Sequence, residues 1–507
     1  MHLQSLCEQF WQATSYNLLF LSIFFFLLFL LKSKRCTKLN LPPSPPKLPI
    51  IGNLHQLGKV RHHSLRDLSH KYGPLMMLQL GQISTLVISS ADMAKEMIKT
   101  HDIVFSNRPR TTAPNIFFYG CKDVLFSPYG EYWRQVKRIS VLEIFTHKRV
   151  KSFQLVREEE IEHMINRVRN ACLNEDSVNL SEMIFGITNN IVSRCVLGRR
   201  AVEENITNKF GALFKRFMVQ LEASAFGDIF PCLAWMDVLT GLIGRLKATF
   251  TELDAFLDQV IEEHRTSNSY DTQYDRQDFV DILLQLQKDG DHLEIELLKD
   301  NLKAILVDMF VGGTDTTATT IEWAMAELIK NPNVMKKAQQ EVRSVVGKKS
   351  RIDVKDINQM DNLKCIIKET MRLHPPAPFL VPRETSASAK LGGYDIPPRT
   401  RVLINAWAIQ KDPGIWDKPE EFIPARFENN PIDLKGLHFQ LIPFGAGRRG
   451  CPGISFALAT AEYMIANLLY WFDWKIAAGQ TLDMSEVYGI VVHKKFPLRL
   501  LPISCCP

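Results

Sequence analysis

No two of the ten cysteines in this 507-residue chain stand at the C-x-x-C spacing. A zinc site and a disulfide framework are therefore not indicated, and the cysteine usage suits a reducing compartment. The chain also lacks an arginine-rich stretch interleaved with aromatic residues, so we expect no nucleic-acid partner. No internal repeat occurs either, so nothing in the sequence marks a repeat architecture.

The charge balance is mildly basic, with a formal net charge of +6 and an isoelectric point near 8.7. This balance suits an anionic membrane surface or an acidic protein partner better than it suits nucleic acid. Hydrophobic residues make up 46% of the chain and charged residues 23%, which is ordinary for a globular protein. A chain of this length can build a core that encloses a large cofactor.

An uncharged apolar run, Tyr16–Leu31, lies near the N-terminus and, extended back to Trp11, is long enough to span a bilayer as a helix. Four basic residues follow between positions 32 and 38, whereas no lysine or arginine precedes the run. The positive-inside rule then leaves the rest of the chain in the cytosol. A cleaved signal peptide is the alternative, but it would carry its positive charges before the run. We therefore expect residues 1–31 to form a single-pass anchor and residues 32–49, basic and proline-rich, to form a stiff hinge.

Most of the chain after the hinge has a helical period. Amphipathic helices are predicted at residues 153–169 and 251–264, and a long, buried central helix at residues 297–330. A short hairpin is predicted from residues 75–81 and 85–88, with further strands at 401–404 and 489–500. The expected fold is mainly helical with a minor sheet, and residues 50–507 are expected to form one catalytic domain.

The most informative stretch surrounds a single cysteine near the C-terminus. Phe444, Gly447, Arg449, Cys451 and Gly453 fit the pattern F-x-x-G-x-R-x-C-x-G. A thiolate stays ionised in a positive, hydrogen-bonding setting, and glycine lets the backbone approach the sulfur. The pattern resembles the haem-binding loop of the cytochrome P-450 superfamily. The resemblance implies haem b bound between this loop and the central helix, with Cys451 as the axial iron ligand and Arg449 paired with a propionate. Phe444 and Gly447 belong to the same set of cofactor-binding residues.

The central apolar helix is interrupted at residues 312–317 by two glycines, an acid and threonines. Threonine can donate a hydrogen bond to the carbonyl of the preceding turn and bend a helix, and function is expected where local rules are broken. The stretch resembles the superfamily's oxygen-activation motif, [AG]-G-x-[DE]-T-[TS]. By that resemblance, Thr316 hydrogen-bonds dioxygen at the iron and Asp315 helps to relay protons.

Glu369 and Arg372 are spaced so that both lie on one face of a helix, although most such pairs are solvated at the surface. They resemble the superfamily's E-x-x-R motif, whose third member is an arginine in a P-E-R-F segment. This chain reads P-A-R-F, which retains Arg426 and replaces the glutamate with Ala425. We expect a Glu369–Arg372–Arg426 network that lacks one peripheral charge. His374, beside two prolines at the helix end, is interpreted as structural rather than as an axial ligand.

Trp133 and Lys137 resemble the W-x-x-x-R helix in which tryptophan and arginine bind the haem propionates. Lysine supplies a point charge but not a bidentate fork, so the sequence leaves open whether Lys137, Arg138 or Arg134 takes that place. Arg383, after a proline, matches a further propionate-binding arginine.

Further stretches resemble plant microsomal members of the A-type group: residues 47–53, 72–74, 105–109, 405–409 and 441–445. The resemblance implies an endoplasmic reticulum membrane protein with its catalytic domain on the cytosolic face. It also implies electrons from NADPH through a flavoprotein, the NADPH–cytochrome P-450 reductase, with a cytochrome b-type protein as a second candidate donor. The expected substrate is a hydrophobic specialised metabolite, with a terpenoid preferred to an alkaloid, a phenolic or a flavonoid.

The same resemblance places nine apolar or small residues near the substrate. They are Phe117, Phe118, Leu125, Phe310, Gly313, Thr317, Ala377, Phe379 and Ile490. We expect a dry pocket with little to hold a charged substrate.

Two other functions fit a haem-thiolate protein. A haem-thiolate isomerase or dehydratase acts without reductase or dioxygen and typically lacks the acid–threonine pair, so Asp315 and Thr316 argue against it. A non-catalytic haem carrier or sensor would not need Thr316. We therefore expect a monooxygenase, and NADPH consumption in the presence of reductase distinguishes the three functions.

Overall fold

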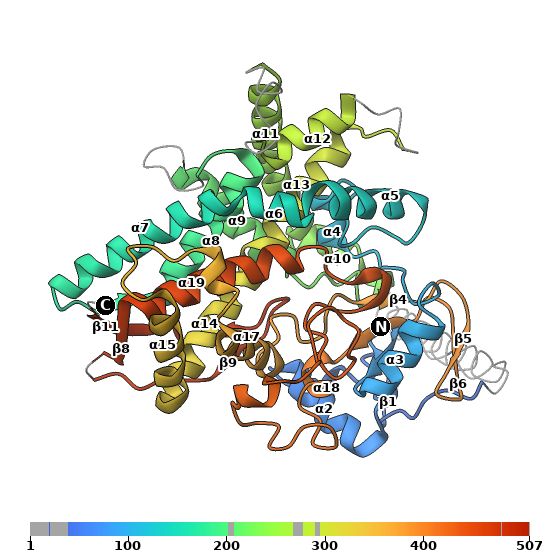
Figure 1. Ribbon diagram of the computed structural model, residues 1–507. Helices are drawn as coiled ribbons and strands as arrows, with labels where there is room; N and C mark the ends of the chain where they lie inside the picture. Colours follow the sequence, from blue (N-terminus) through green and yellow to red (C-terminus); the bar gives the residue numbers. More distant parts are fainter. Residues whose placement is uncertain are drawn as a thin grey trace, which may run out of the picture.

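The computed structural model describes residues 20, 39–200, 207–266, 277–288, 295–477 and 479–505. Helices make up most of it, and the strands form small sheets (Figure 1). The expected mainly helical fold with a minor sheet is confirmed. The helices are α2 (Arg61–Tyr72), α3 (Ala91–Thr100), α4 (Thr112–Phe117), α5 (Glu131–Ile139), α6 (His147–Ser152), α7 (Gln154–Leu173), α8 (Leu180–Leu197), α9 (Thr207–Leu221), α10 (Met236–Leu239), α11 (Leu242–Thr266), α12 (Phe279–Lys288), α13 (Lys299–Gly313), α14 (Asp315–Lys330), α15 (Pro332–Val346), α16 (Val354–Ile357), α17 (Asp361–Leu373), α18 (Ala406–Ile409) and α19 (Ile454–Trp471).

The strands of the described residues form one four-stranded sheet and three smaller ones. They are β1 (Leu75–Leu80), β2 (Ile83–Ile88), β3 (Val178–Asn179), β4 (Arg383–Glu384), β5 (Ala389–Leu391), β6 (Tyr394–Ile396), β7 (Arg401–Ile404), β8 (Phe472–Ile476), β9 (Glu486–Val487), β10 (His493–Lys494) and β11 (Arg499–Ser504). The largest sheet has the order β1-β2-β7-β4, and the others are β3-β11-β8, β5-β6 and β9-β10.

The predicted hairpin and the strand predicted at 401–404 are both present. β1 and β2 pair antiparallel as a hairpin, with Leu75 opposite Ile88, and β2 pairs in parallel with β7. The strand-like segment predicted at 489–500 is divided between two strands, since β10 and the start of β11 lie within that range. Pro497 lacks the N–H that a continuous ladder would require, and β10 turns back onto β9 instead.

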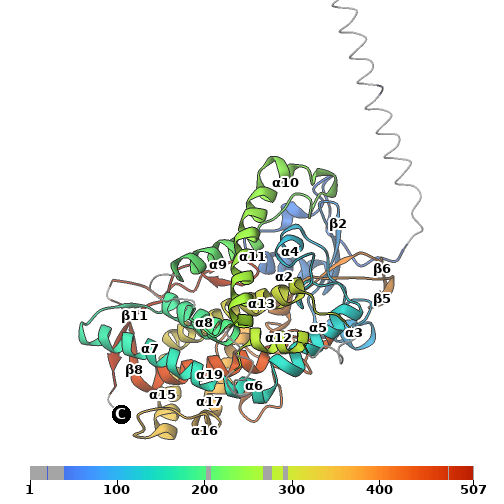
Figure 2. The same ribbon diagram turned by 90° about the horizontal axis from the view of Figure 1, so that it is seen from above.

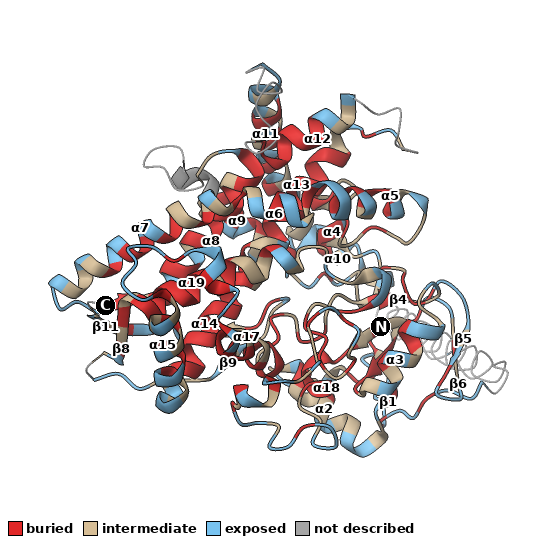
Figure 3. Cartoon of the chain, in the orientation of Figure 1, coloured by how far each residue is buried: buried red, intermediate tan, exposed pale blue. Residues whose placement is uncertain are grey.

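The central helix is present and is almost wholly buried. α13 and α14 are separated only at Thr314, and the hydrogen bonds from Thr314 N to Phe310 O and from Ala318 N to Thr314 O carry the axis through the break. The second half packs against α8, α17 and α19. Figure 2 shows α13 among the surrounding helices, and Figure 3 shows how much of α14 and α19 is buried. A helix that is apolar on all sides has to be enclosed by other parts of the protein, as this one is.

The predicted anchor at residues 1–31 lies outside the described residues, apart from Phe20. Within the described ranges, no helix is both long enough and apolar enough to cross a membrane. The second part of the predicted hinge is attached to the first sheet. Pro43 O accepts a hydrogen bond from Met77 N at 2.9 Å, and Asn53 Nδ2 donates to Pro45 O at 3.3 Å. The proline-rich segment is therefore held against β1.

A buried ion pair ties α17 to the segment before the cysteine loop. The side chains of Glu369 and Arg372 are both fully buried. Arg372 donates from Nε and Nη2 to the two carboxylate oxygens of Glu369 at 2.7 and 2.9 Å. Arg426 Nε donates to Glu369 Oε1 at 3.0 Å, so the structure brings the three expected residues together. The backbone N–H of Ile423 also donates to Glu369 Oε1, at 2.8 Å, and so Glu369 is well bonded although Ala425 brings no charge.

Substituting Arg372 by alanine should be strongly destabilising. The change would leave Glu369 buried without its bidentate partner, which costs roughly 3–5 kcal/mol. We expect Arg372→Ala protein to accumulate poorly and to unfold at a lower denaturant concentration. Glu421→Ala is the control, because its carboxylate is mostly exposed and should change stability by less than about 0.5 kcal/mol. Equal stability of the two variants would contradict the importance of this network.

Candidate active site

A cavity of about 260 Å³ lies between the central helix and the cysteine loop. Cys451 and Phe444 line one side, and Gly312, Gly313 and Thr316 line the other. The rest of the wall is largely apolar and includes Leu125, Val192, Val196, Met218, Leu221, Met309, Val311, Ala377, Leu380, Val381, Ile490 and Val491. The arrangement suits a ligand that is itself mainly apolar.

The conformation of the cysteine loop depends on Gly447. Its φ is +68°, and a Cβ there would lie 2.6 Å from Ile98 Cγ2 and 2.9 Å from Asp102 Oδ2. Both the backbone conformation and the packing therefore require glycine. The loop closes on itself, because Cys451 N donates to Phe444 O at 2.9 Å. The result is a tight turn that places Cys451 on the cavity wall.

Two opposing influences act on the thiol of Cys451. Burial raises its pKa, whereas the backbone N–H of Gly453 and the positive charge of Lys137 favour the thiolate. Burial dominates, so the free thiol has a raised pKa. A bound metal ion supplies the further positive charge that deprotonates such a thiol. The site therefore fits a metal-ligating cysteine.

Four basic side chains surround the same end of the cavity: Arg108, Lys137, Arg383 and Arg449. Among the described residues, one carboxylate forms an ion pair with a member of this group. It is Asp102, whose Oδ1 lies 3.0 Å from Arg383 Nη1. Burial and the charge of Arg383 lower the pKa of Arg449 to about 9. Buried cations that depress one another's pKa require anions, and the two propionates of haem meet that requirement. The residues present therefore fit haem.

The structure distinguishes the three basic candidates near Trp133. Lys137 lines the cavity and donates from Nζ to Gly450 O at 2.5 Å, and burial lowers its pKa to about 8. Arg134 and Arg138 are exposed and do not line the cavity. Trp133 Nε1 donates to Val124 O at 2.9 Å, and the indole lies 4.0 Å from the Arg449 guanidinium. Trp133 is thus placed to hold Arg449 through a cation–π contact.

The residues of the expected oxygen-activation motif face two directions. Thr316 lines the cavity, and its Oγ1 donates to Gly312 O at 2.6 Å. Thr317 also lines the cavity, and its buried hydroxyl has no hydrogen-bond partner among the described residues. Asp315 is directed elsewhere, because its Oδ2 lies 3.2 Å from Nε2 of His493. The cavity wall therefore presents hydroxyls, while the carboxylate lies behind them.

Five of the nine expected substrate residues line the cavity: Leu125, Gly313, Thr317, Ala377 and Ile490. The other four, Phe117, Phe118, Phe310 and Phe379, are not among the residues that line it. Each packs instead against other aromatic rings, as Phe117 does against Phe217 at 4.8 Å and Phe310 against Phe214 at 5.5 Å. Aromatic residues stabilise each other in such clusters, so they form core here rather than cavity wall.

Sequence reasoning missed Arg108 and His493. Arg108 lies in a stretch recognised only for its resemblance to plant members, and His493 lies in a short strand without any motif. A sequence signal exists for Arg108, because it is adjacent to a proline as Arg383 is. The proline follows Arg108 and precedes Arg383. No local signal identifies His493, because its partners are 174 and 178 positions away.

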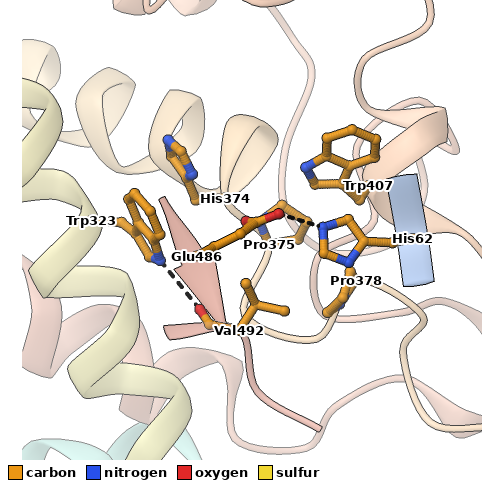
Figure 4. Close-up of a pocket in the computed structure, with 8 residues that line it drawn as sticks. All are labelled: His62, Trp323, His374, Pro375, Pro378, Trp407, Glu486 and Val492. Carbon is orange, nitrogen blue, oxygen red and sulfur yellow. Dashed lines mark hydrogen bonds and ion pairs between the residues drawn. The ribbon is translucent and has the colours of Figure 1, made fainter. Parts of the chain in front are cut away.

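A second pocket lies at the C-terminal end of α17, beside His374 (Figure 4). His374 stacks on Trp323 with ring centroids 4.1 Å apart, and its Nε2 lies 2.9 Å from Glu327 Oε1. Glu486 lies 2.9 Å from Nε2 of His62, a contact that ties β9 to α2. His374 does not line the cavity that holds Cys451. These contacts agree with a structural role for His374.

Comparisons with known proteins agree with this site. The model of the family described as Cytochrome P450 matches residues 42–499. The chain is 49% identical to phenylacetaldehyde oxime monooxygenase of Prunus mume, with both chains covered completely. It is 54% identical to cytochrome P450 71A1 of Persea americana, over 96% of this chain and 98% of that one. It is 48% identical to desmethylyatein synthase of Sinopodophyllum hexandrum, over 97% and 99%. A zebra fish cytochrome P450 solved with abiraterone has a TM-score of 0.76 at 26% identity, covering 88% of this chain and all of that one.

The chain belongs to the cytochrome P450 family. It is a monooxygenase of the plant type that the sequence resembled, and it has the fold expected from that resemblance. Family membership implies a haem cofactor and a redox partner that supplies electrons. The isomerase and carrier alternatives are thereby set aside.

Cys451→Ala should abolish thiolate ligation. We expect the reduced protein with carbon monoxide to show the red-shifted Soret band of a haem-thiolate, and the variant to lose it, because alanine offers no ligand. Cys172→Ala is the matched control, since this half-buried cysteine lies on α7 outside the cavity wall. A red-shifted band that survives Cys451→Ala would assign the ligand elsewhere.

Proposed function

We propose that the protein is a membrane-anchored haem-thiolate monooxygenase that oxidises an uncharged, apolar plant specialised metabolite. The observation that carries this proposal is the position of Cys451 and Thr316 on opposing walls of one apolar cavity with a cationic end. Haem bound there supplies dioxygen activation and the insertion of one oxygen atom into a substrate bond, with the second oxygen leaving as water.

Each group of residues has one task in this proposal. Cys451 holds the haem iron, with Phe444 and Gly447 shaping its loop. Arg108, Lys137, Arg383 and Arg449 bind the propionates, and Trp133 orients Arg449. Thr316 holds a hydroxyl at the cavity wall, where its hydrogen bond to Gly312 O fixes the oxygen and leaves both of its lone pairs free to accept. Asp315 stores and passes protons behind it. Glu369, Arg372 and Arg426 keep the loop in place.

The apolar wall supports an uncharged substrate. Asp308 lines the cavity, and burial and the charge of Asp123 raise its pKa well above its usual range, which disfavours the charged form that would bind a cationic substrate. We test a panel of terpenoids, alkaloids, phenolics and aryl oximes for a substrate-induced spin shift. The oximes are included because one relative is named as an oxime monooxygenase. Carboxylated analogues of each active compound are the control and should bind at least about tenfold more weakly, because haem occupies the cationic end and the apolar part offers no partner for the charge.

We also propose the division of the chain into an anchor at residues 1–31, a hinge at 32–49 and a catalytic domain at 50–507. The uncharged run and the basic residues after it support insertion into the endoplasmic reticulum membrane with the catalytic domain in the cytosol. There the protein would take electrons from the membrane-bound NADPH–cytochrome P-450 reductase, with a cytochrome b-type protein as an alternative donor.

Removing residues 2–31 should release the protein from strong membrane insertion and leave haem binding intact. The cavity-lining residues that the structure describes lie between Arg108 and Val491, and the proline-rich stretch that contacts β1 is retained. Membrane fractionation and the carbon monoxide spectrum of the truncated protein measure the two effects separately. A truncated protein that fails to take up haem would contradict this division of the chain.

Thr316→Ala should separate oxygen activation from haem binding. The carbon monoxide spectrum and the spin shift should persist, because Thr316 is not the iron ligand. Product formed per NADPH consumed should fall, because a hydroxyl that positions protons has been removed and reduced oxygen escapes as peroxide. Thr188→Ala is the control, since it removes a similarly back-bonded hydroxyl from α8 outside the cavity wall. Unchanged coupling in Thr316→Ala would mean that protons take another route.

A further inference from the structure

His493 connects the carboxylate behind the cavity to the protein surface. Its Nε2 lies 3.2 Å from Asp315 Oδ2, and its Nδ1 lies 3.0 Å from Thr319 Oγ1. Asp315 and Thr319 are one turn apart on α14, so a single imidazole spans both. β10, which carries His493, contacts α14 directly. The geometry fixes the ring against the helix by both of its nitrogens.

Exposure changes along this chain of groups. The side chain of Asp315 is 12% exposed and does not line the cavity, whereas the side chain of His493 is 41% exposed. Asp315 therefore has little direct access to solvent, and the ring bonded to it has much more. His493 therefore offers a hydrogen-bonded path between solvent and Asp315.

The charges around His493 favour a protonated ring. Burial lowers the pKa of His493, but the hydrogen bond to Asp315 and the nearby carboxylates of Glu322 and Glu222 raise it, and the net effect is a pKa above the ordinary value. Lys494, the next residue, donates to Asp483 O and lies over the Trp323 ring at 5.1 Å. The basic neighbour is thus held by other groups, while carboxylates face the imidazole.

We propose that His493 is the positioning residue through which Asp315 is held and supplied with protons from solvent. The proposal rests on the proton-delivery role of Asp315 in the proposed function. The imidazolium gives its Nε2 proton to Asp315 Oδ2, which converts the carboxylate to a carboxylic acid and the ring to neutral imidazole. The Nδ1 proton stays on the hydrogen bond to Thr319. The exposed ring then regains a proton at Nε2 from water or a buffer acid, so no electrons move and charge is conserved.

The test compares two ways of driving the full-length, haem-loaded protein. With reductase, NADPH oxidation requires protons from solvent. With cumene hydroperoxide, the oxygen arrives already reduced and protonated, and oxidation of tetramethylphenylenediamine reports the reaction. Neither assay requires the natural substrate. The variants are His493→Gln, which can hydrogen-bond but cannot carry a proton, and His493→Lys, which restores a cation beside Asp315.

His493→Gln should lower the NADPH-driven rate by about tenfold at neutral pH, less than the ~10²-fold or more expected for losing a general acid itself. The peroxide-driven rate should stay within about twofold, because it bypasses the proton supply. His493→Lys should recover part of the NADPH-driven rate. His163→Gln, an exposed histidine on α7, is the control and should change neither rate.

The pH profile provides a second measurement. The wild-type NADPH-driven rate should fall as the pH rises through the raised pKa of His493, because the ring loses the proton that it supplies. His493→Gln should lack this alkaline decline. Equal loss in both assays, or an unchanged profile, would show a merely structural role and overturn the proposal.

The same assays separate the two levels of inference. If Asp315→Asn leaves the NADPH-driven rate unchanged, the proposed proton-delivery function itself fails. If Asp315→Asn is impaired and His493→Gln is not, only the role of His493 is wrong. The carbon monoxide spectrum of each variant confirms that loss of turnover is not loss of haem.

Discussion

The position of the cysteine loop depends on the buried pair of Glu369 and Arg372. Arg372 donates not only to Glu369 but also from Nη1 to Gln410 O at 3.0 Å. Gln410 in turn accepts at Oε1 from Ile442 N at 2.9 Å, and Ile442 O accepts from Gly445 N, which opens the turn that ends at Cys451. A chain of hydrogen bonds thus runs from α17 to the turn that carries Cys451. Because both members of the pair are fully buried, removing one leaves the other without its partner, at the full cost of its desolvation.

The parts of the molecule that the sequence predicts are those encoded within a few residues. The hairpin of β1 and β2 follows from two short apolar runs on either side of Gly81. The cysteine turn follows from the glycine that is required at position 447, and the helix break follows from the threonines after Gly313. The substrate cavity is different, because its wall is assembled from elements remote in sequence, among them α8, α9, α13 and α14. Whether an apolar ring such as Phe117 or Phe310 lines the cavity or packs on another ring depends on those remote neighbours.

The two ends of the cavity require opposite chemistry, and the buried carboxyls maintain the difference. Asp308 Oδ2 accepts from Val124 N at 2.5 Å, which ties the loop before α5 to the central helix. Burial raises the pKa of Asp123 to about 6, and burial together with the charge of Asp123 raises the pKa of Asp308 well above its usual range. The raised pKa of Asp308 disfavours the negative charge that would neutralise the cations of the propionate end. Those cations stay available for haem, and Asp308 adds little charge to the apolar end.

The geometry of an α-helix explains why the acid and the alcohol of the central motif need a third group. Adjacent residues in a helix point about 100° apart, since 3.6 residues make one turn. With Thr316 on the cavity wall, Asp315 must therefore face the helices and strands behind it, where its carboxylate is largely removed from solvent at a cost in free energy. A partner from elsewhere in the chain has to offset that cost. His493 offsets that cost from β10. The helix register fixes where Asp315 and Thr316 lie on α14, but only the folded chain brings the imidazole of His493 next to them.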